Sequence, residues 1–154
     1  MKALVIYDSV YGNTKRIAEA VAKEIPGSVL VNVKDANYSL LSGIGLLVMG
    51  SPTHGGNESP ALQKFIAGIP KDSLRGMKVA CFDTWISQEG QGFLTRAAVG
   101  IFGHAAPRTL ARLQHAGGSR TGQPEGFFVK GKQGPLAEGE LERAREWARK
   151  LVED

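Results

Sequence analysis

The sequence predicts an α/β fold with a doubly wound, five-stranded parallel sheet covered by helices on both faces. Short apolar runs rich in Val, Ile and Leu alternate along the chain with longer segments of helical periodicity. Several of these runs are apolar at consecutive positions, as expected for strands buried on both faces. A chain of 154 residues can bury a core of its own, so we expect a single domain over residues 1–154.

The first half of the chain is expected to contain three strands and two helices. Ala3–Tyr7 is the first strand, and the helix Asn13–Glu24 presents an apolar face and ends at Pro26-Gly27. The partial alternation of Ser28–Val33 is typical of a strand toward the sheet edge, whereas Ile44–Gly50 is nearly all apolar and therefore central. A capping Ser and a Pro, Ser59-Pro60, begin the next helix.

The second half is expected to add two strands and two helices. Met77–Phe82 is the fourth strand, and residues 86–103 give no clear element. A helix over Ala105–Ala116 precedes the fifth strand, Gly126–Lys130. The helix Glu138–Val152 has apolar residues at spacings of three and four, and its charges match the helix dipole.

Five such strands usually take the order 2-1-3-4-5, in which a ligand binds where strands 1 and 3 diverge. The loops after strands 1, 3 and 4 then meet on one rim of the sheet. In this chain those loops are Ser9–Thr14, Ser51–Asn57 and Asp83–Trp85.

The first of these loops is suited to hold a phosphate. It joins a buried strand to a helix N-terminus, where backbone N–H groups and the helix dipole favour an anion. Its candidate binding residues are Ser9, Val10, Tyr11, Gly12, Asn13 and Thr14. Asp8–Thr14 contains no Lys or Arg, which favours a monophosphate held by neutral donors. On this loop alone, an ordinary strand–loop–helix joint with a capping hydroxyl is an equal alternative.

The other two loops are suited to hold a flat ring system. Their candidate residues are Pro52, Thr53, His54, Gly55, Gly56, Asp83, Thr84 and Trp85. Thr53-His54 and Trp85 can flank a ring, and the glycines allow a peptide to turn its carbonyl toward the ring edge. Alternatively, His54 bonds only locally and Trp85 is a core aromatic. His104 and His115 are expected away from this rim.

The segment Ser9-Val10-Tyr11-Gly12-Asn13-Thr14 resembles the phosphate loop of the flavodoxin family. Gly50–Gly56 is similar to the family's second flavin loop, and Phe82-Asp83-Thr84 to the start of its third. The end of the chain, from Gly126 on, looks like that of small prokaryotic flavodoxin-domain proteins. The resemblance implies FMN as cofactor, and an electron carrier or a small flavin-dependent reductase of the quinone reductase type as function. Tyr11 stands where the family usually has Thr.

Composition limits the remaining possibilities. The net charge of +4 contrasts with the acidity of electron-carrier flavodoxins, but the cations are dispersed and no nucleic-acid motif accompanies them. One cysteine, Cys81, excludes an intrachain disulfide. No apolar stretch approaches membrane-spanning length and no signal peptide precedes the first strand, so a cytoplasmic location is expected.

Two rival functions have the same strand order. A phosphoacceptor receiver domain needs an Asp at the end of strand 3, and Gly50-Ser51-Pro52 provides none. A flavodoxin-like interaction module that has lost its flavin remains the alternative. Expected partners are a redox protein or a small quinone-like acceptor, and the sequence does not indicate the oligomeric state.

Overall fold

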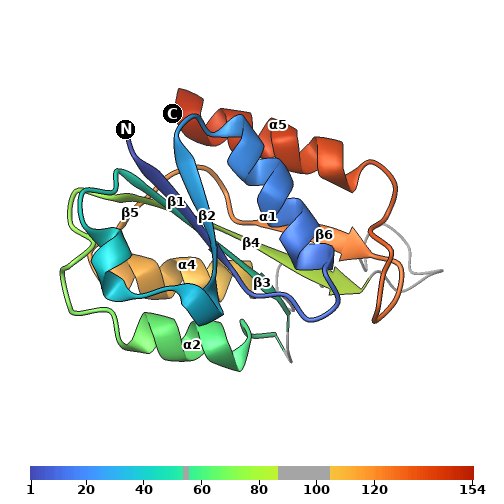
Figure 1. Cartoon of the computed structure of the whole chain (residues 1–154), viewed down its shortest axis with the longest axis horizontal. Helices are drawn as coiled ribbons and strands as arrows, with labels where there is room; N and C mark the ends of the chain where they lie inside the picture. Colours follow the sequence, from blue (N-terminus) through green and yellow to red (C-terminus); the bar gives the residue numbers. More distant parts are fainter. Residues whose placement is uncertain (54–55, 87–104) are drawn as a thin grey trace.

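The computed structural model describes residues 1–53, 56–86 and 105–154, and it contains one parallel sheet with strand order β2-β1-β3-β4-β5 (Figure 1). The predicted order 2-1-3-4-5 is confirmed. The elements are β1 (Ala3–Tyr7), α1 (Asn13–Glu24), β2 (Ser28–Asn32), the 3₁₀ helices η1 (Val33–Asp35) and η2 (Tyr38–Leu41), β3 (Leu46–Pro52), α2 (Pro60–Ala67), β4 (Lys78–Ile86), α4 (Ala106–His115), β5 (Ser119–Arg120), β6 (Glu125–Val129) and α5 (Glu140–Glu153).

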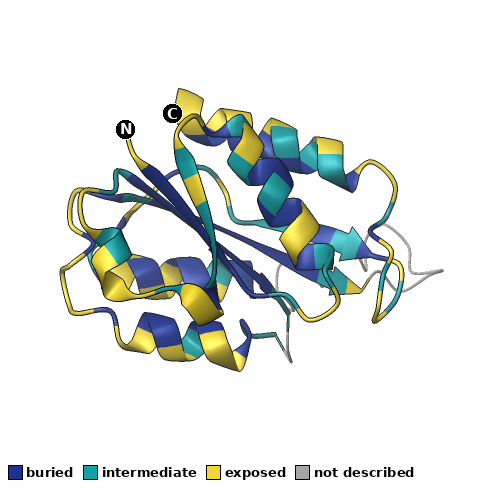
Figure 2. Ribbon diagram, in the orientation of Figure 1, coloured by how far each residue is buried: buried dark blue, intermediate teal, exposed yellow. Residues whose placement is uncertain are grey.

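Helices cover both faces of the sheet (Figure 1). α1 and α5 pack together on one face, over a core that includes Val5, Val48 and Phe82. α2 and α4 cover the other, over a core that includes Leu47 and Cys81. The central strands are buried nearly throughout, as Figure 2 shows, whereas β2 at the edge is partly exposed, as its alternation predicts.

The fifth position in the sheet is divided between two strands. β5 pairs with the start of β4 (Lys78 with Ser119), and β6 pairs with its end, from Phe82–Glu125 to Ile86–Val129. The predicted fifth strand, Gly126–Lys130, corresponds to β6. β5 was not predicted because it has only two residues, both exposed and polar, and therefore no apolar pattern.

β4 is longer than its apolar run, and the prediction that Asp83, Thr84 and Trp85 form a loop is wrong. All three lie inside β4, which continues to Ile86 because both β3 and β6 pair with this end. Side chains alternate along a strand. Thr84 and Ile86 therefore lie on the α1/α5 side of the sheet, whereas Asp83 and Trp85 lie on the α2/α4 side.

The predicted helices are confirmed with small shifts of their ends. α1 has the expected bounds, and α5 begins at Glu140, after Gly139 with φ 80°. No helix in residues 1–53, 56–86 and 105–154 is long and apolar enough to cross a membrane.

Candidate functional site

A cavity of about 320 Å³ lies at the carboxyl ends of β1, β3 and β4, where the sequence predicts a ligand site. Its lining residues come from the three segments that were predicted to meet here, from the ends of β4 and β6, and from the loop between β6 and α5. They are Ser9, Val10, Tyr11, Asn13, Thr14, Pro52, Thr53, Thr84, Ile86, Val129 and Lys132. The fold therefore brings together residues from both halves of the chain at one rim.

The remaining predicted residues lie elsewhere or outside the described part. Gly12 is the N-cap of α1, with φ 91°. Trp85 packs against Phe128, with ring centroids 5.0 Å apart, and is not among the described lining residues. Gly56 has the positive φ, 82°, that the sequence suggested for this loop. His54 and Gly55 lie outside the described residues, as does His104.

The N-terminus of α1 leaves several backbone donors free. Ser9 Oγ accepts hydrogen bonds from the N–H groups of Gly12 (3.1 Å) and Lys15 (3.3 Å). Four other N–H groups of this loop have no acceptor in the described part of the chain: those of Val10, Tyr11, Asn13 and Thr14. The helix end therefore still has capacity to bind an anion.

The charges around this helix end are also unbalanced. The first turn of α1 contains Lys15 and Arg16 and no acidic residue, although the helix dipole disfavours cations there. Lys132 lines the same cavity from the loop between β6 and α5. None of the three cations forms an ion pair with another described residue. Excess positive charge at a helix N-terminus favours an anionic ligand.

Thr84 connects the three predicted segments of the site through hydrogen bonds. Its hydroxyl oxygen lies 2.7 Å from Thr14 Oγ1, in a buried contact, and its carbonyl accepts a hydrogen bond from Thr53 N at 2.9 Å. Beside it on β4, Asp83 Oδ2 accepts a hydrogen bond from Ala106 N at the start of α4, at 2.7 Å. We conclude that Thr84 positions the cavity walls while Asp83 positions α4.

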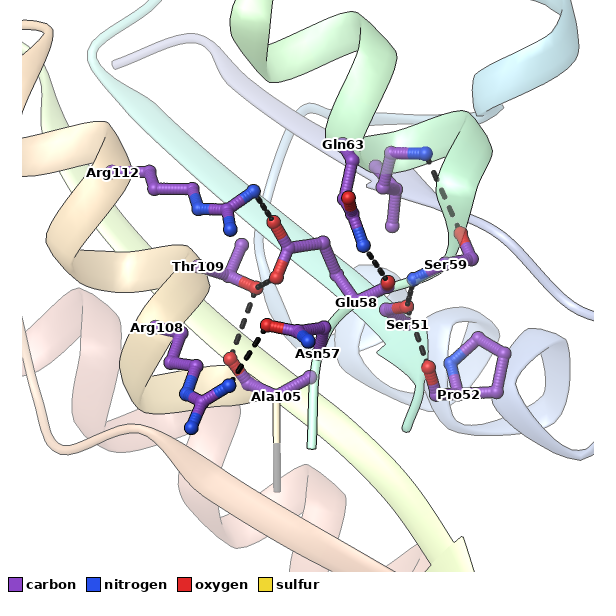
Figure 3. Close-up of polar contacts among 11 residues, drawn as sticks. Ser51, Pro52, Asn57, Glu58, Ser59, Gln63, Ala105, Arg108, Thr109 and Arg112 are labelled. Atoms are coloured by element: carbon purple, nitrogen blue, oxygen red, sulfur yellow. Dashed lines mark hydrogen bonds and ion pairs between the residues drawn. The ribbon is translucent and has the colours of Figure 1, made fainter. Parts of the chain in front are cut away.

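A second polar cluster fixes the loop between β3 and α2 (Figure 3). The carboxylate of Glu58 is fully buried, is paired with Arg112 and accepts a hydrogen bond from Thr109 Oγ1 at 3.2 Å. Next to it, Asn57 Oδ1 accepts a hydrogen bond from Arg108 Nη1 at 3.0 Å. These contacts attach the loop to α4.

The other end of the same loop is held by Ser51. Its hydroxyl accepts a hydrogen bond from Ser59 N and donates one to the carbonyl of Pro52, both at 2.8 Å (Figure 3). Pro52 lines the cavity, so the cluster supports one wall of the site.

Sequence reasoning missed Lys132 and Glu58. For Lys132 there was a signal: Lys130-Gly131-Lys132 directly follows β6, whose carboxyl end is at the same rim as that of β4. Glu58 had no comparable signal, because its partners Thr109 and Arg112 are far away in the sequence.

A larger cavity of about 570 Å³ lies between α2 and α4, away from the predicted residues. It is lined by Gln63, Ile66, Ala67, Ile69, Lys71, Ala111, Arg112, His115 and Ala116. Most of its lining belongs to helix surfaces, whose backbone N–H groups are already used within the helices. The smaller cavity at the rim is the better ligand site, because free backbone N–H groups and cations surround it.

The rim cavity fits the FMN that the resemblance implies. Its volume is in the range of small-molecule sites. The free N–H groups and the cations suit a phosphate, the hydroxyls of Thr53 and Thr84 suit a polyol chain, and the apolar side chains of Val10 and Ile86 suit a ring.

Comparisons with known proteins agree with this assignment. The family model described as Flavodoxin matches residues 5–147. A flavodoxin from Clostridium saccharobutylicum is 26% identical over 157 aligned positions, which cover 99% of this chain and 96% of that protein.

Solved structures show the same fold. The oxidised Flavodoxin 2 from Bacillus cereus aligns with a TM-score of 0.79 and 22% identity, over 99% of each chain. The rubredoxin:oxygen oxidoreductase from Desulfovibrio gigas aligns with a TM-score of 0.65 and 20% identity, over 99% of this chain but 35% of that one. The match of the family model over nearly the whole chain is decisive: the chain belongs to the flavodoxin family.

Proposed function

We propose that this protein is an electron carrier that uses FMN, the cofactor of its family, to exchange electrons with a redox partner protein. The observation that carries the proposal is the rim cavity, where free backbone donors and excess positive charge lie beside hydroxyl and apolar side chains. Bound FMN supplies the redox chemistry, since its isoalloxazine ring takes up and releases electrons.

The residues of the site divide the binding between them. The N–H groups of Val10, Tyr11, Asn13 and Thr14 hold the phosphate, and the hydroxyl of Ser9 fixes the loop that presents them. Residues of the second and third predicted segments bind the remainder of the cofactor, with the exception of Asp83 and Trp85, which lie on the α2/α4 side of the sheet. Thr53 and Thr84 bind the ribityl chain, and Pro52, His54, Gly55 and Gly56 border the ring.

The rim suits a carrier because three large apolar side chains lining the cavity are exposed. Val10, Tyr11 and Ile86 are exposed to 60%, 46% and 47%. Such a border lets a partner protein approach the cofactor edge closely.

A pair of kinetic assays tests the carrier proposal. Photoreduced protein is mixed with ferricytochrome c, which accepts one electron per molecule, and the oxidised protein is assayed separately for NADPH-driven reduction of menadione. A carrier reduces the cytochrome rapidly and shows no menadione turnover. Sustained NADPH-driven turnover identifies a reductase, and failure to take up FMN identifies the interaction module.

We also propose that the protein is located in the cytoplasm. The only cysteine of the chain, Cys81, is a buried free thiol, which fits a reducing compartment. Cell fractionation tests this assignment, and recovery of the protein outside the cytoplasmic fraction contradicts it.

A further inference from the structure

The loop between β6 and α5 contributes a cation, Lys132, to the lining of the rim cavity. Lys132 lines the cavity together with Ser9, Tyr11, Asn13 and Thr14, the residues of the first loop. Its ammonium group has no ion-pair partner within residues 1–53, 56–86 and 105–154. The cavity lining therefore contains a cation from a distant segment in addition to the neutral residues of the first loop.

Hydrogen bonds and close packing hold this loop in place. Lys130 N donates to the carbonyl of Pro135 at 2.9 Å, and Gly134 N donates to that of Gly131 at 3.0 Å, which closes the turn around Lys132. A Cβ atom at Gly134 would lie 2.7 Å from Asn13 Oδ1, so the loop packs directly against the first residue of α1. The backbone that carries Lys132 is thus anchored beside the helix N-terminus.

The chain also contains a matched comparison for Lys132. Lys130 belongs to the same loop, has the same charge and is exposed, but it is not among the described residues that line the cavity. The two lysines therefore differ in position and not in chemistry. A contribution from net charge alone would be nearly the same for both.

We propose that Lys132 binds the phosphate of FMN and increases the preference of this protein for FMN over riboflavin. The inference rests on the proposed function and adds a residue that the first loop does not contain. The phosphate carries about two negative charges at neutral pH, so the ammonium group of Lys132, added to the N–H donors of the first loop, strengthens its binding. Riboflavin has the same ring and ribityl chain but no phosphate, and it gains nothing from Lys132.

The test compares Lys132→Gln, Lys132→Arg and Lys130→Gln with the wild type. Apoprotein is titrated with FMN and with riboflavin, and the dissociation constants come from quenching of flavin fluorescence at about 0.05 M and about 0.5 M NaCl. At low salt, Lys132→Gln is expected to weaken FMN binding about tenfold and riboflavin binding less than about twofold. Lys132→Arg restores most of the FMN affinity because it keeps the charge.

Two further results are expected at the same time. Lys130→Gln changes FMN affinity by less than about twofold, and the difference between wild type and Lys132→Gln shrinks at high salt. An equal loss for FMN and riboflavin would assign Lys132 a purely structural role, and equal losses for the two lysine variants would reduce the effect to net charge. Either result overturns the proposal, as does unchanged FMN affinity in Lys132→Gln.

These outcomes are distinct from failure of the proposed function. A wild-type protein that binds neither flavin refutes both the FMN site and the role of Lys132. A wild-type protein that binds FMN, with a Lys132→Gln variant that binds it equally well, refutes only the inference.

Discussion

The side-chain oxygens of Thr14 and Thr84 lie 2.7 Å apart in a buried hydrogen bond that connects the first turn of α1 to the end of β4. The two residues are far apart in the sequence, and both line the rim cavity. The contact therefore fixes the position of the proposed phosphate loop relative to the end of β4.

The removal of one of these hydroxyls is expected to lower the free energy of unfolding by more than the net contribution of a single hydrogen bond. Thr84→Val leaves the Thr14 hydroxyl buried without its partner and should lower the free energy of unfolding by about 1–3 kcal/mol. In the double variant Thr14→Val/Thr84→Val, the loss should be smaller than the sum of the single losses, because no orphaned hydroxyl remains. Urea unfolding of the four apoproteins measures this coupling, and strictly additive losses would contradict it.

The ion pair between Arg112 and Glu58 should matter more than the neighbouring contact of Arg108. Arg112→Gln leaves a fully buried carboxylate without its cation, and because Arg112 is itself 43% exposed, we expect a loss of about 1–3 kcal/mol, below that of a fully buried pair. Arg108→Gln removes only an exposed bond to Asn57 and should cost less than about 0.5 kcal/mol. Thermal unfolding monitored by circular dichroism compares the stability of the two variants. Equal losses of stability would show that Arg112 does not stabilise the buried carboxylate of Glu58.

Gly56 offers a test of the second loop, with Gly76 as its control. Both have positive φ, 82° and 79°, so an alanine at either position should cost about 1 kcal/mol of stability. Only Gly56→Ala is expected to change the midpoint potential of bound FMN, because only Gly56 belongs to a loop that we place at the ring edge. A spectroelectrochemical titration decides this. Equal potentials for both variants and the wild type would remove Gly56 from the redox site.

Cys81 predicts a loss of stability in alkaline solution. Burial raises the pKa of its thiol well above the ordinary value of 9.0, and the negative charges of Glu58 and Asp83 add to the effect. The unfolded chain releases this proton at lower pH than the folded one, so stability is constant below the ordinary pKa and falls above it. Urea unfolding at about pH 7 and about pH 10 should show this fall, and Cys81→Ala should reduce it. An identical fall in the variant would assign it to other groups.

Local patterns predicted those parts of the molecule that depend on neighbouring residues. The bounds of α1 and the buried character of β1 and β3 follow from periodicity within each segment. β4 was cut short at Phe82 because Asp83 and Thr84 are polar. Their inclusion in the strand comes from pairing with β3 and β6, which a single segment does not reveal.

The candidate site was predictable to the same extent. The first loop carries its own signal, since a buried strand, small polar residues and a helix follow one another in Ala3–Glu24. Trp85 was expected to flank a ring, but its position in β4 puts it on the α2/α4 side, against Phe128. Lys132 and Glu58 act through residues distant in sequence, so only the folded chain shows their surroundings.

The central claim is that FMN binds at the rim with its phosphate on the first loop. Two-dimensional ¹H–¹⁵N spectra of the apoprotein titrated with FMN and with riboflavin test it most directly. The account predicts that FMN shifts the amide proton resonances of Val10, Tyr11, Asn13 and Thr14 downfield, as hydrogen bonds to a phosphate do, and that riboflavin shifts them much less. Equal shifts with both flavins, or shifts confined to the cavity between α2 and α4, would contradict it.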